Sequence, residues 1–274
     1  MLTELVNGYH RVMADGDHRT NEWPLMSSPV LTHAIVGMYL LFVYKIGPSL
    51  MANRPAYDLR HLIMVYNAGL VYLSWYTFWN VGWSGWWTYY DWKCQLVDTT
   101  TRGDPMARLT WLFFVSKLVE LLDTVFFVLR KKTRQITPLH MIHHTGMPLC
   151  MWWAAKFAPG GHGSIIGLIN SFVHVVMYSY YFLAAFGPAI EPYLWWKKYI
   201  TQLQLIQFAF IFGHTTQAMM RSDCDYPRPF MWLLEVPSVM FIFMFGQFYI
   251  RTYRRDARKE RELRQLKKSD QLGG

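Results

Sequence analysis

Seven long apolar stretches constrain this chain more than any other feature. A helix that crosses a bilayer needs about 20 mostly apolar residues. The chain carries a net charge of +9, yet its charged residues gather between stretches of that length. The sequence therefore predicts an all-α integral membrane protein with seven transmembrane helices. The expected spans cover residues 29–47, 61–82, 108–129, 138–158, 164–186, 196–219 and 230–250.

The basic residues predict the direction in which the chain crosses the membrane. Short loops rich in Lys and Arg stay in the cytosol. The sequence RKKTR (130–134) contains four Lys or Arg residues and no acidic residue. The tail 251–274 holds nine Lys or Arg against four Asp or Glu. We expect a lumenal N-terminal segment (1–28), a seven-helix membrane domain (29–250) and a basic cytosolic tail (251–274). Because topology explains these charges, we expect no nucleic acid partner.

Three histidines lie at the start of the fourth stretch, in the sequence LHMIHHTGM (139–147). Thr137 is suited to cap a helix and Pro138 to occupy its first position, so the span is expected to begin there. His140, His143 and His144 then share one broad face within its first two turns. Neutral imidazoles in this position could act as nucleophile, base or metal ligand.

Three other stretches carry polar side chains at helical spacing. Charged residues inside a membrane must face one another or water, and they are usually functional. A structural alternative is that Lys117 and Glu120 only neutralise each other. The convergence of several polar faces at overlapping depths favours a site. Its expected members are Lys117, Glu120 and Asp123 in the third stretch, Asn170, His174, Tyr178 and Tyr181 in the fifth, and Thr201, Gln204 and Gln207 in the sixth.

Clustered histidines fit two kinds of chemistry. Membrane desaturases and hydroxylases hold iron with His-x-x-His-His boxes, but they need about three boxes and this chain has one. Acyl transfer without a metal needs a neutral imidazole that attacks a thioester and a second histidine that moves protons. We therefore expect no metal and keep the metal-dependent lipid oxygenase as an alternative. A seven-span transporter is the other alternative, although no pair of related halves is visible.

Four ordered motifs resemble the very-long-chain fatty acid elongases, the ELO family of 3-ketoacyl-CoA synthases. They are KLVELLDTVFFVLRKK, LHMIHH, NSFVHVVMYSYY and TQLQLIQF. The resemblance implies an endoplasmic reticulum enzyme whose helical bundle encloses an acyl channel. Such an enzyme condenses malonyl-CoA with a fatty acyl-CoA and releases CO2 and CoA. Apart from these substrates, the resemblance implies no cofactor. It implies contact with membrane lipid and association with the reductases and dehydratase of the elongation cycle. It is also compatible with a homo-oligomer.

The resemblance also implies roles for the polar residues of the membrane domain. His143 is expected to form an acyl-histidine, with His174 opposite it, while His140 and His144 orient groups or accept protons. Lys117, Glu120 and Asp123 are expected to belong to the catalytic group and can balance charge among themselves. Hydrogen bonds to the thioester or enolate are expected from Asn170, Tyr178 and Gln204. The CoA phosphates would meet a basic rim of Arg130, Lys131, Lys132, Lys197, Lys198, Arg251 and Arg254.

The three cysteines are expected to play structural parts. Cys94 and Cys224 fall in loops on the lumenal side, where disulfides are permitted. We predict that they are bonded to each other, the alternative being two free thiols. Cys150 lies seven residues after His143 and deeper in the membrane, and we expect it to serve in packing.

Overall fold

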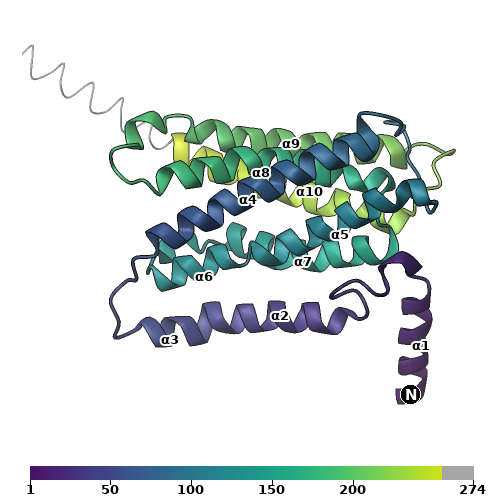
Figure 1. Ribbon diagram of the computed structural model, residues 1–274, viewed down its shortest axis with the longest axis horizontal. Coiled ribbons are helices and arrows are strands. Elements are labelled where there is room, and N and C mark those ends of the chain that lie inside the picture. Colours follow the sequence, from purple (N-terminus) through teal and green to yellow (C-terminus); the bar gives the residue numbers. More distant parts are fainter. Residues whose placement is uncertain (255–274) are drawn as a thin grey trace, which may run out of the picture.

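The computed structural model describes residues 1–254, and all regular structure in that range is helical (Figure 1). The prediction of an all-α fold is therefore confirmed for the described part of the chain. Helices occupy all seven expected stretches. They are α2 (Pro29–Leu41), which continues through η2 (Phe42–Ile46) into α3 (Gly47–Met51), α4 (Arg60–Val81), α5 (Asp104–Val119) with α6 (Leu122–Leu129), α7 (Pro138–Phe157), α8 (Ile165–Ala184), α9 (Lys197–Met219) and α10 (Arg228–Tyr249).

Shorter elements cover the ends and connections of the bundle. They are α1 (Leu2–Ala14), η1 (His18–Thr20), η3 (Gly82–Trp86), η4 (Thr101–Gly103), η5 (Thr133–Gln135), η6 (Gly161–Ser164), η7 (Glu191–Tyr193) and η8 (Ile250–Arg254). The basic tail falls almost wholly outside the described residues, as does the side chain of Arg254.

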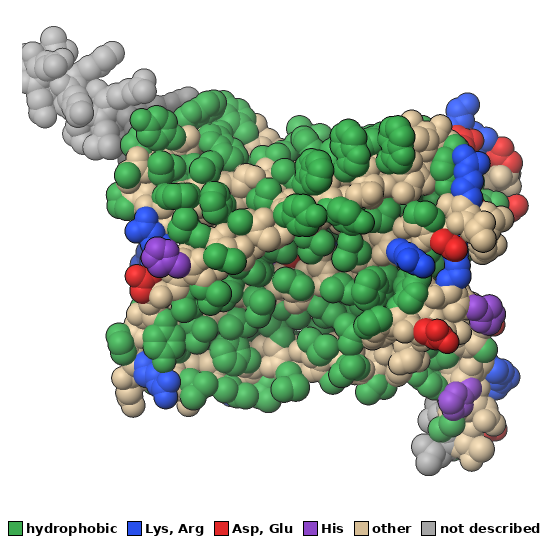
Figure 2. All heavy atoms as spheres, in the orientation of Figure 1, with side chains coloured by type: hydrophobic (Ala, Val, Ile, Leu, Met, Phe, Trp, Pro, Cys, Tyr) green, Lys and Arg blue, Asp and Glu red, His purple; other side chains and the backbone are tan. Residues whose placement is uncertain are grey.

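Three helical segments in the described range are long and apolar enough to cross a membrane: Pro29–Met51, Gly161–Ala184 and Arg228–Tyr253. The helices of the other four stretches fall short of that criterion. Polar and charged side chains lower the hydropathy of these stretches, and the third stretch is also divided into the shorter helices α5 and α6. Figure 2 shows hydrophobic side chains over the middle of one face and charged side chains at its two ends. This distribution is that of a multi-pass membrane protein.

The helices pack pairwise into one bundle. α4 lies along α8, α9 along α10, and α5 along α7, while α2 and α3 cover the outside of α7 and α6 (Figure 1). A large buried cluster joins Trp152 of α7, Phe114 of α5, Phe208 of α9 and Phe241 of α10. This packing brings the polar residues of α5, α7, α8 and α9 into one interior.

The third expected span is not one continuous helix. α5 ends at Val119 and α6 begins at Leu122, with Glu120 and Leu121 in a turn between them. The Leu121 amide donates to the carbonyl oxygen of Leu118 (3.2 Å), and the Asp123 amide donates to that of Glu120 (3.2 Å). These tighter bonds between residues three apart interrupt the α-helix at its most charged point. The expectation of an unbroken helix over 108–129 is therefore wrong.

A disulfide joins Cys94, in the connection between α4 and α5, to Cys224, in the connection between α9 and α10. The two residues are 130 positions apart in the sequence. Cys150 is a free, partly buried thiol within α7. The disulfide therefore links distant parts of the chain at the end of the bundle opposite to the start of α7.

Removing the disulfide is expected to lower the melting temperature of the purified protein. Closure of so long a loop restricts the unfolded chain, by several kcal/mol in the chain-entropy account. The change is C94S with C224S, measured by thermal unfolding in detergent, and the matched control is Cys150→Ser, which breaks no cross-link. Peptide mapping without reductant that finds both thiols free in fresh membranes would contradict the pairing.

Candidate functional site

A buried ion pair lies where α5 gives way to α6. Lys117 Nζ donates to Glu120 Oε1 at 2.7 Å, and each residue is only 2% exposed. Their spacing of three places both on one side of the last turn of α5. Burial of two charges is costly unless further hydrogen bonds satisfy them. Neighbouring helices provide those bonds here.

α8 supplies the partners of this pair. Lys117 Nζ donates to Asn170 Oδ1 at 2.9 Å, and His174 Nδ1 lies 3.2 Å from Glu120 Oε1. Asn170 and His174 are four residues apart, so one face of α8 presents both. Asn170 Nδ2 in turn donates to Gln207 Oε1 on α9 at 3.3 Å. The network therefore connects α5, α8 and α9 through side chains alone.

Asp123 belongs to a second contact one turn further along. The hydroxyl of Tyr178, which is fully buried on α8, donates to Asp123 Oδ2 at 2.9 Å. Tyr178 is four residues after His174, so both contacts use the same face of α8. Its ring also lies beside that of Tyr181, which is 43% exposed and faces the outside of the network.

The histidine box is positioned by the start of α7. Thr137 caps the helix, since its side-chain oxygen accepts from the His140 amide at 3.2 Å, and Pro138 follows as its first residue. This confirms the helix start predicted from the sequence. The ring centroids of His140 and His144 are 4.1 Å apart, and those of His143 and His144 are 5.3 Å apart.

Two residues near His140 are missing from the sequence predictions. Thr124 Oγ1 lies 2.7 Å from His140 Nε2, and the hydroxyl of Tyr39, on α2, lies 2.7 Å from Thr124 Oγ1. Thr124 directly follows Asp123, and Tyr39 interrupts an apolar span. The sequence shows the polar side chains of Thr124 and Tyr39, but it does not indicate which residue on another helix each one contacts.

His143 lines a cavity inside the bundle. Asn170 and Gln207 also line it, together with Met147 and Cys150 of α7. An adjoining, mostly apolar cavity shares Met151, Ile166, Leu233 and Leu234 with the first and extends toward Tyr226 and Phe230. A group bound at His143 would therefore have an apolar space beside it, and polar contacts from α8 and α9.

The remaining expected residues lie around this interior or at its end. Thr201 is buried, and Gln204 Nε2 contacts the sulfur of Met177 at 3.5 Å. Arg130 is partly buried at the end of α6. Figure 1 shows the end of α6, the start of α9 and the end of α10 at the same end of the bundle. Exposed cations lie at these three helix ends: Lys131 and Lys132 after α6, Lys197 and Lys198 at the start of α9, and Arg251 after α10.

Within residues 1–254, no group of three or more His, Cys, Asp or Glu side chains is placed to hold a metal ion. The box histidines instead contact one another, Thr124 and the ring of Phe241, which lies 5.2 Å from that of His143.

Comparison with known families identifies the chain's relatives. Residues 24–261 match the family model described as ELO, the GNS1/SUR4 family. The chain belongs to the ELO family. This ELO protein is 44% identical over 267 residues to very long chain fatty acid elongase 1 of Homo sapiens, a match that covers 96% of both chains. It is 42% identical over 255 residues to elongase 7 of Drosophila melanogaster, covering 92% of this chain and 78% of the relative.

The family match contains the whole polar interior of this ELO protein. It begins at residue 24, shortly before α2, and extends past the end of α10. α1 and η1 lie outside it. The site therefore lies within the region that the family model matches, whereas α1 lies before it.

Proposed function

We propose that this ELO protein condenses malonyl-CoA with a long-chain fatty acyl-CoA, giving 3-ketoacyl-CoA, CO2 and CoA. The relatives are named very long chain fatty acid elongases, which supports a role in fatty acid elongation. The observation that carries the proposal is the cavity at His143, which has Asn170 and Gln207 in its wall and an apolar space beside it. His143 and the two side-chain amides suit a reacting thioester carbonyl, and the apolar lining beside them suits the hydrocarbon next to that carbonyl.

In the first half-reaction, an imidazole nitrogen of His143 attacks the thioester carbonyl of the acyl-CoA. The C–S bond breaks and CoA leaves as the thiol with the proton released from the ring. The product is an acyl-histidine. Amide groups of Asn170 and Gln207 near the cavity would stabilise the oxyanion that forms during the attack.

In the second half-reaction, malonyl-CoA loses CO2 and its enolate carbon attacks the acyl carbon. The bond to His143 breaks and the imidazole recovers a proton, so 3-ketoacyl-CoA is released and the enzyme is regenerated. His174 is held by Glu120 at 3.2 Å. In this proposal it would stabilise the enolate or move the proton. Lys117 keeps the Glu120 carboxylate paired during both steps.

We further propose seven spans in the endoplasmic reticulum membrane, with the N-terminus in the lumen and the C-terminus in the cytosol. The box and the basic rim then open toward cytosolic CoA, while the disulfide lies in the lumen, an oxidising compartment. This orientation would also place the product within reach of the reductases and dehydratase of the elongation cycle. Association of two copies is compatible with this arrangement.

The direct test supplies purified protein with a long-chain acyl-CoA and malonyl-CoA labelled at its free carboxyl. Release of labelled CO2 together with a 3-ketoacyl-CoA supports the proposal. Uptake of a solute into vesicles without turnover would favour the transporter instead.

Activity is expected to be independent of bound metal, because Lys117 can balance the buried carboxylate without a metal ion. The measurement compares turnover before and after chelation, with metal content determined by mass spectrometry. Stoichiometric iron or zinc whose removal stops turnover would contradict this expectation and revive the oxygenase alternative.

A further inference from the structure

The N-terminal helix α1 has a strongly divided sequence. Apolar residues recur at positions 2, 5, 6, 9, 12 and 13, while positions 3, 4, 7, 10 and 11 are polar or charged. At about 100° per residue, the apolar positions fall within an arc of about 120°. Such a helix is stable only where that arc meets an apolar medium.

The apolar side of α1 is largely uncovered by the described chain. Val6 is 46% exposed, Tyr9 39% and Val12 49%. Among the described side chains of α1, only Met13, near the end of the helix, packs against the main hydrophobic cluster. Val6, Tyr9 and Val12 therefore contribute little to the core of the bundle.

The direction of α1 differs from that of the other long helices. In Figure 1 it runs across the bundle axis and projects past the edge formed by α2. The hydroxyl of Tyr9 donates to Ser28 Oγ at 3.0 Å, and Ser28 caps the first span at Pro29. α1 is thus held at the level where the first span begins, across the direction of the spans.

The segment that follows α1 is hydrogen-bonded to the bundle. The Asp17 amide donates to the carbonyl oxygen of Lys156 at 2.8 Å, while Trp111 and Trp152 donate through their indole nitrogens to Pro24 and Leu25 carbonyls. Residues 15–28 are therefore tied to α5 and α7, and α1 is attached to this hydrogen-bonded segment.

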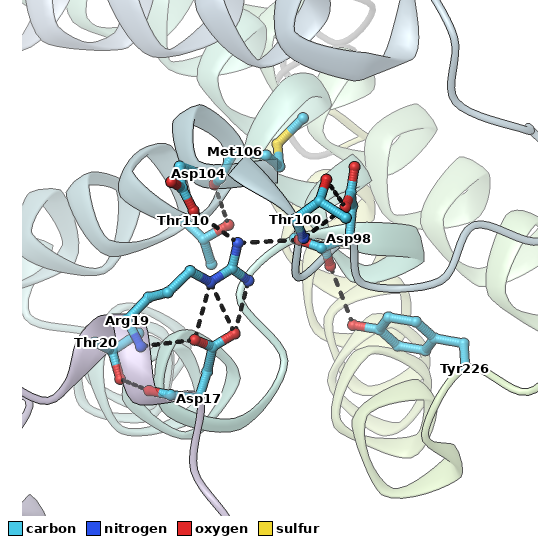
Figure 3. A network of polar contacts seen from close by, with 10 residues as sticks. Asp17, Arg19, Thr20, Asp98, Thr100, Asp104, Met106, Thr110 and Tyr226 are labelled. Carbon is cyan, nitrogen blue, oxygen red and sulfur yellow. Dashed lines mark hydrogen bonds and ion pairs between the residues drawn. The ribbon is translucent and has the colours of Figure 1, made fainter. Parts of the chain in front are cut away.

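Figure 3 shows the ionic part of this support. Arg19 pairs with Asp17 at 2.7 Å and with Asp104, at the start of α5, at 3.2 Å, and it also donates to the carbonyl oxygen of Asp98. Burial alone would raise the pKa of Asp17, but the hydrogen bonds and charge of Arg19 hold that pKa below its ordinary value. The pair therefore stays ionised at neutral pH, and its contribution is lost only as the pH falls through the lowered pKa.

We propose that α1 is an interfacial helix that lies in the lipid–water boundary, with its apolar side in the leaflet nearest the start of α2. The neighbouring surface supports lipid as the occupant, because Val30 and Leu31, at the first turn of α2, are 67% and 54% exposed and continue the apolar surface. α1 carries few charges, with Glu4 and Arg11 near its two ends. Binding therefore depends on apolar burial and does not require anionic lipid.

The test places a polarity-sensitive NBD fluorophore on single cysteines in full-length protein. The background is Cys150→Ala with the disulfide intact, in phosphatidylcholine nanodiscs that hold one copy each. Val6→Cys carries the label on the apolar side, and Asn7→Cys, its neighbour on the polar side, is the matched control. We expect the Val6 label to be quenched several-fold more by shallow doxyl-lipid than the Asn7 label, and several-fold less by aqueous iodide.

Equal quenching of both labels by iodide would overturn the proposal. A Val6 label shielded from both quenchers would also overturn it, because protein would then cover the face. Val12→Glu should restore iodide access at position 6 without loss of the folded, disulfide-linked protein. The measurement involves no turnover, so it is independent of the outcome for condensation.

Discussion

Replacing His143 with Ala is expected to abolish both acyl-enzyme formation and condensation. No neighbouring group can take over the covalent bond, because the side chain of His144 is rotated by about 100° around the helix axis from that of His143. Loss of a covalent nucleophile lowers turnover by roughly 10⁴-fold or more. The measurement is intact-protein mass spectrometry after addition of acyl-CoA without malonyl-CoA, followed by a condensation assay.

Two further Ala variants serve as controls for this experiment. His144→Ala should reduce acylation less than His143→Ala does. His174→Ala should impair the second half-reaction at least as much as the first, since His174 is needed when the enolate arrives. An acyl adduct that persists in His143→Ala would remove that residue from the nucleophile role. An active wild type that forms no adduct would instead indicate direct attack of the enolate on bound acyl-CoA.

Local spacing in the sequence predicted much of the interior. Lys117 with Glu120 and Asn170 with His174 follow the three- and four-residue spacings of a helix, and each pair meets the other in the structure. Thr137 and Pro138 predicted where α7 begins, because capping depends on residues adjacent in the chain. These features depend on one helix at a time, which a sequence pattern can report.

Two local features and one contact between helices are not predicted by the spacing of residues in the sequence. The turn at Glu120 was missed because residues spaced by three suit both a continuous helix and a tighter turn. The contact of Tyr39 with Thr124 joins α2 to α6, and no local spacing relates the two. α1 falls within the expected lumenal N-terminal segment, because its short apolar side is far below the length of a span and so predicts no transmembrane helix.

Lys117→Met is expected to destabilise the protein and stop turnover. It would leave the Glu120 carboxylate buried, with His174 as its remaining close polar contact, and Asn170 Oδ1 would lose its donor. Breaking one side of a buried ion pair typically costs about 3–5 kcal/mol. Thermal unfolding of the purified variant should show a lower melting temperature than the wild type, and labelled CO2 release should fall with it.

The matched control removes both charges, as Lys117→Met with Glu120→Leu. Because apolar residues of similar volume often replace a buried ion pair without loss of stability, the double variant should unfold at a higher temperature than Lys117→Met alone. Its turnover should stay low, since His174 has lost the carboxylate that orients it. A double variant as active as the wild type would show that the pair only neutralises itself within the bundle, and a Lys117→Met protein of full stability would show that Glu120 is not left as a buried charge.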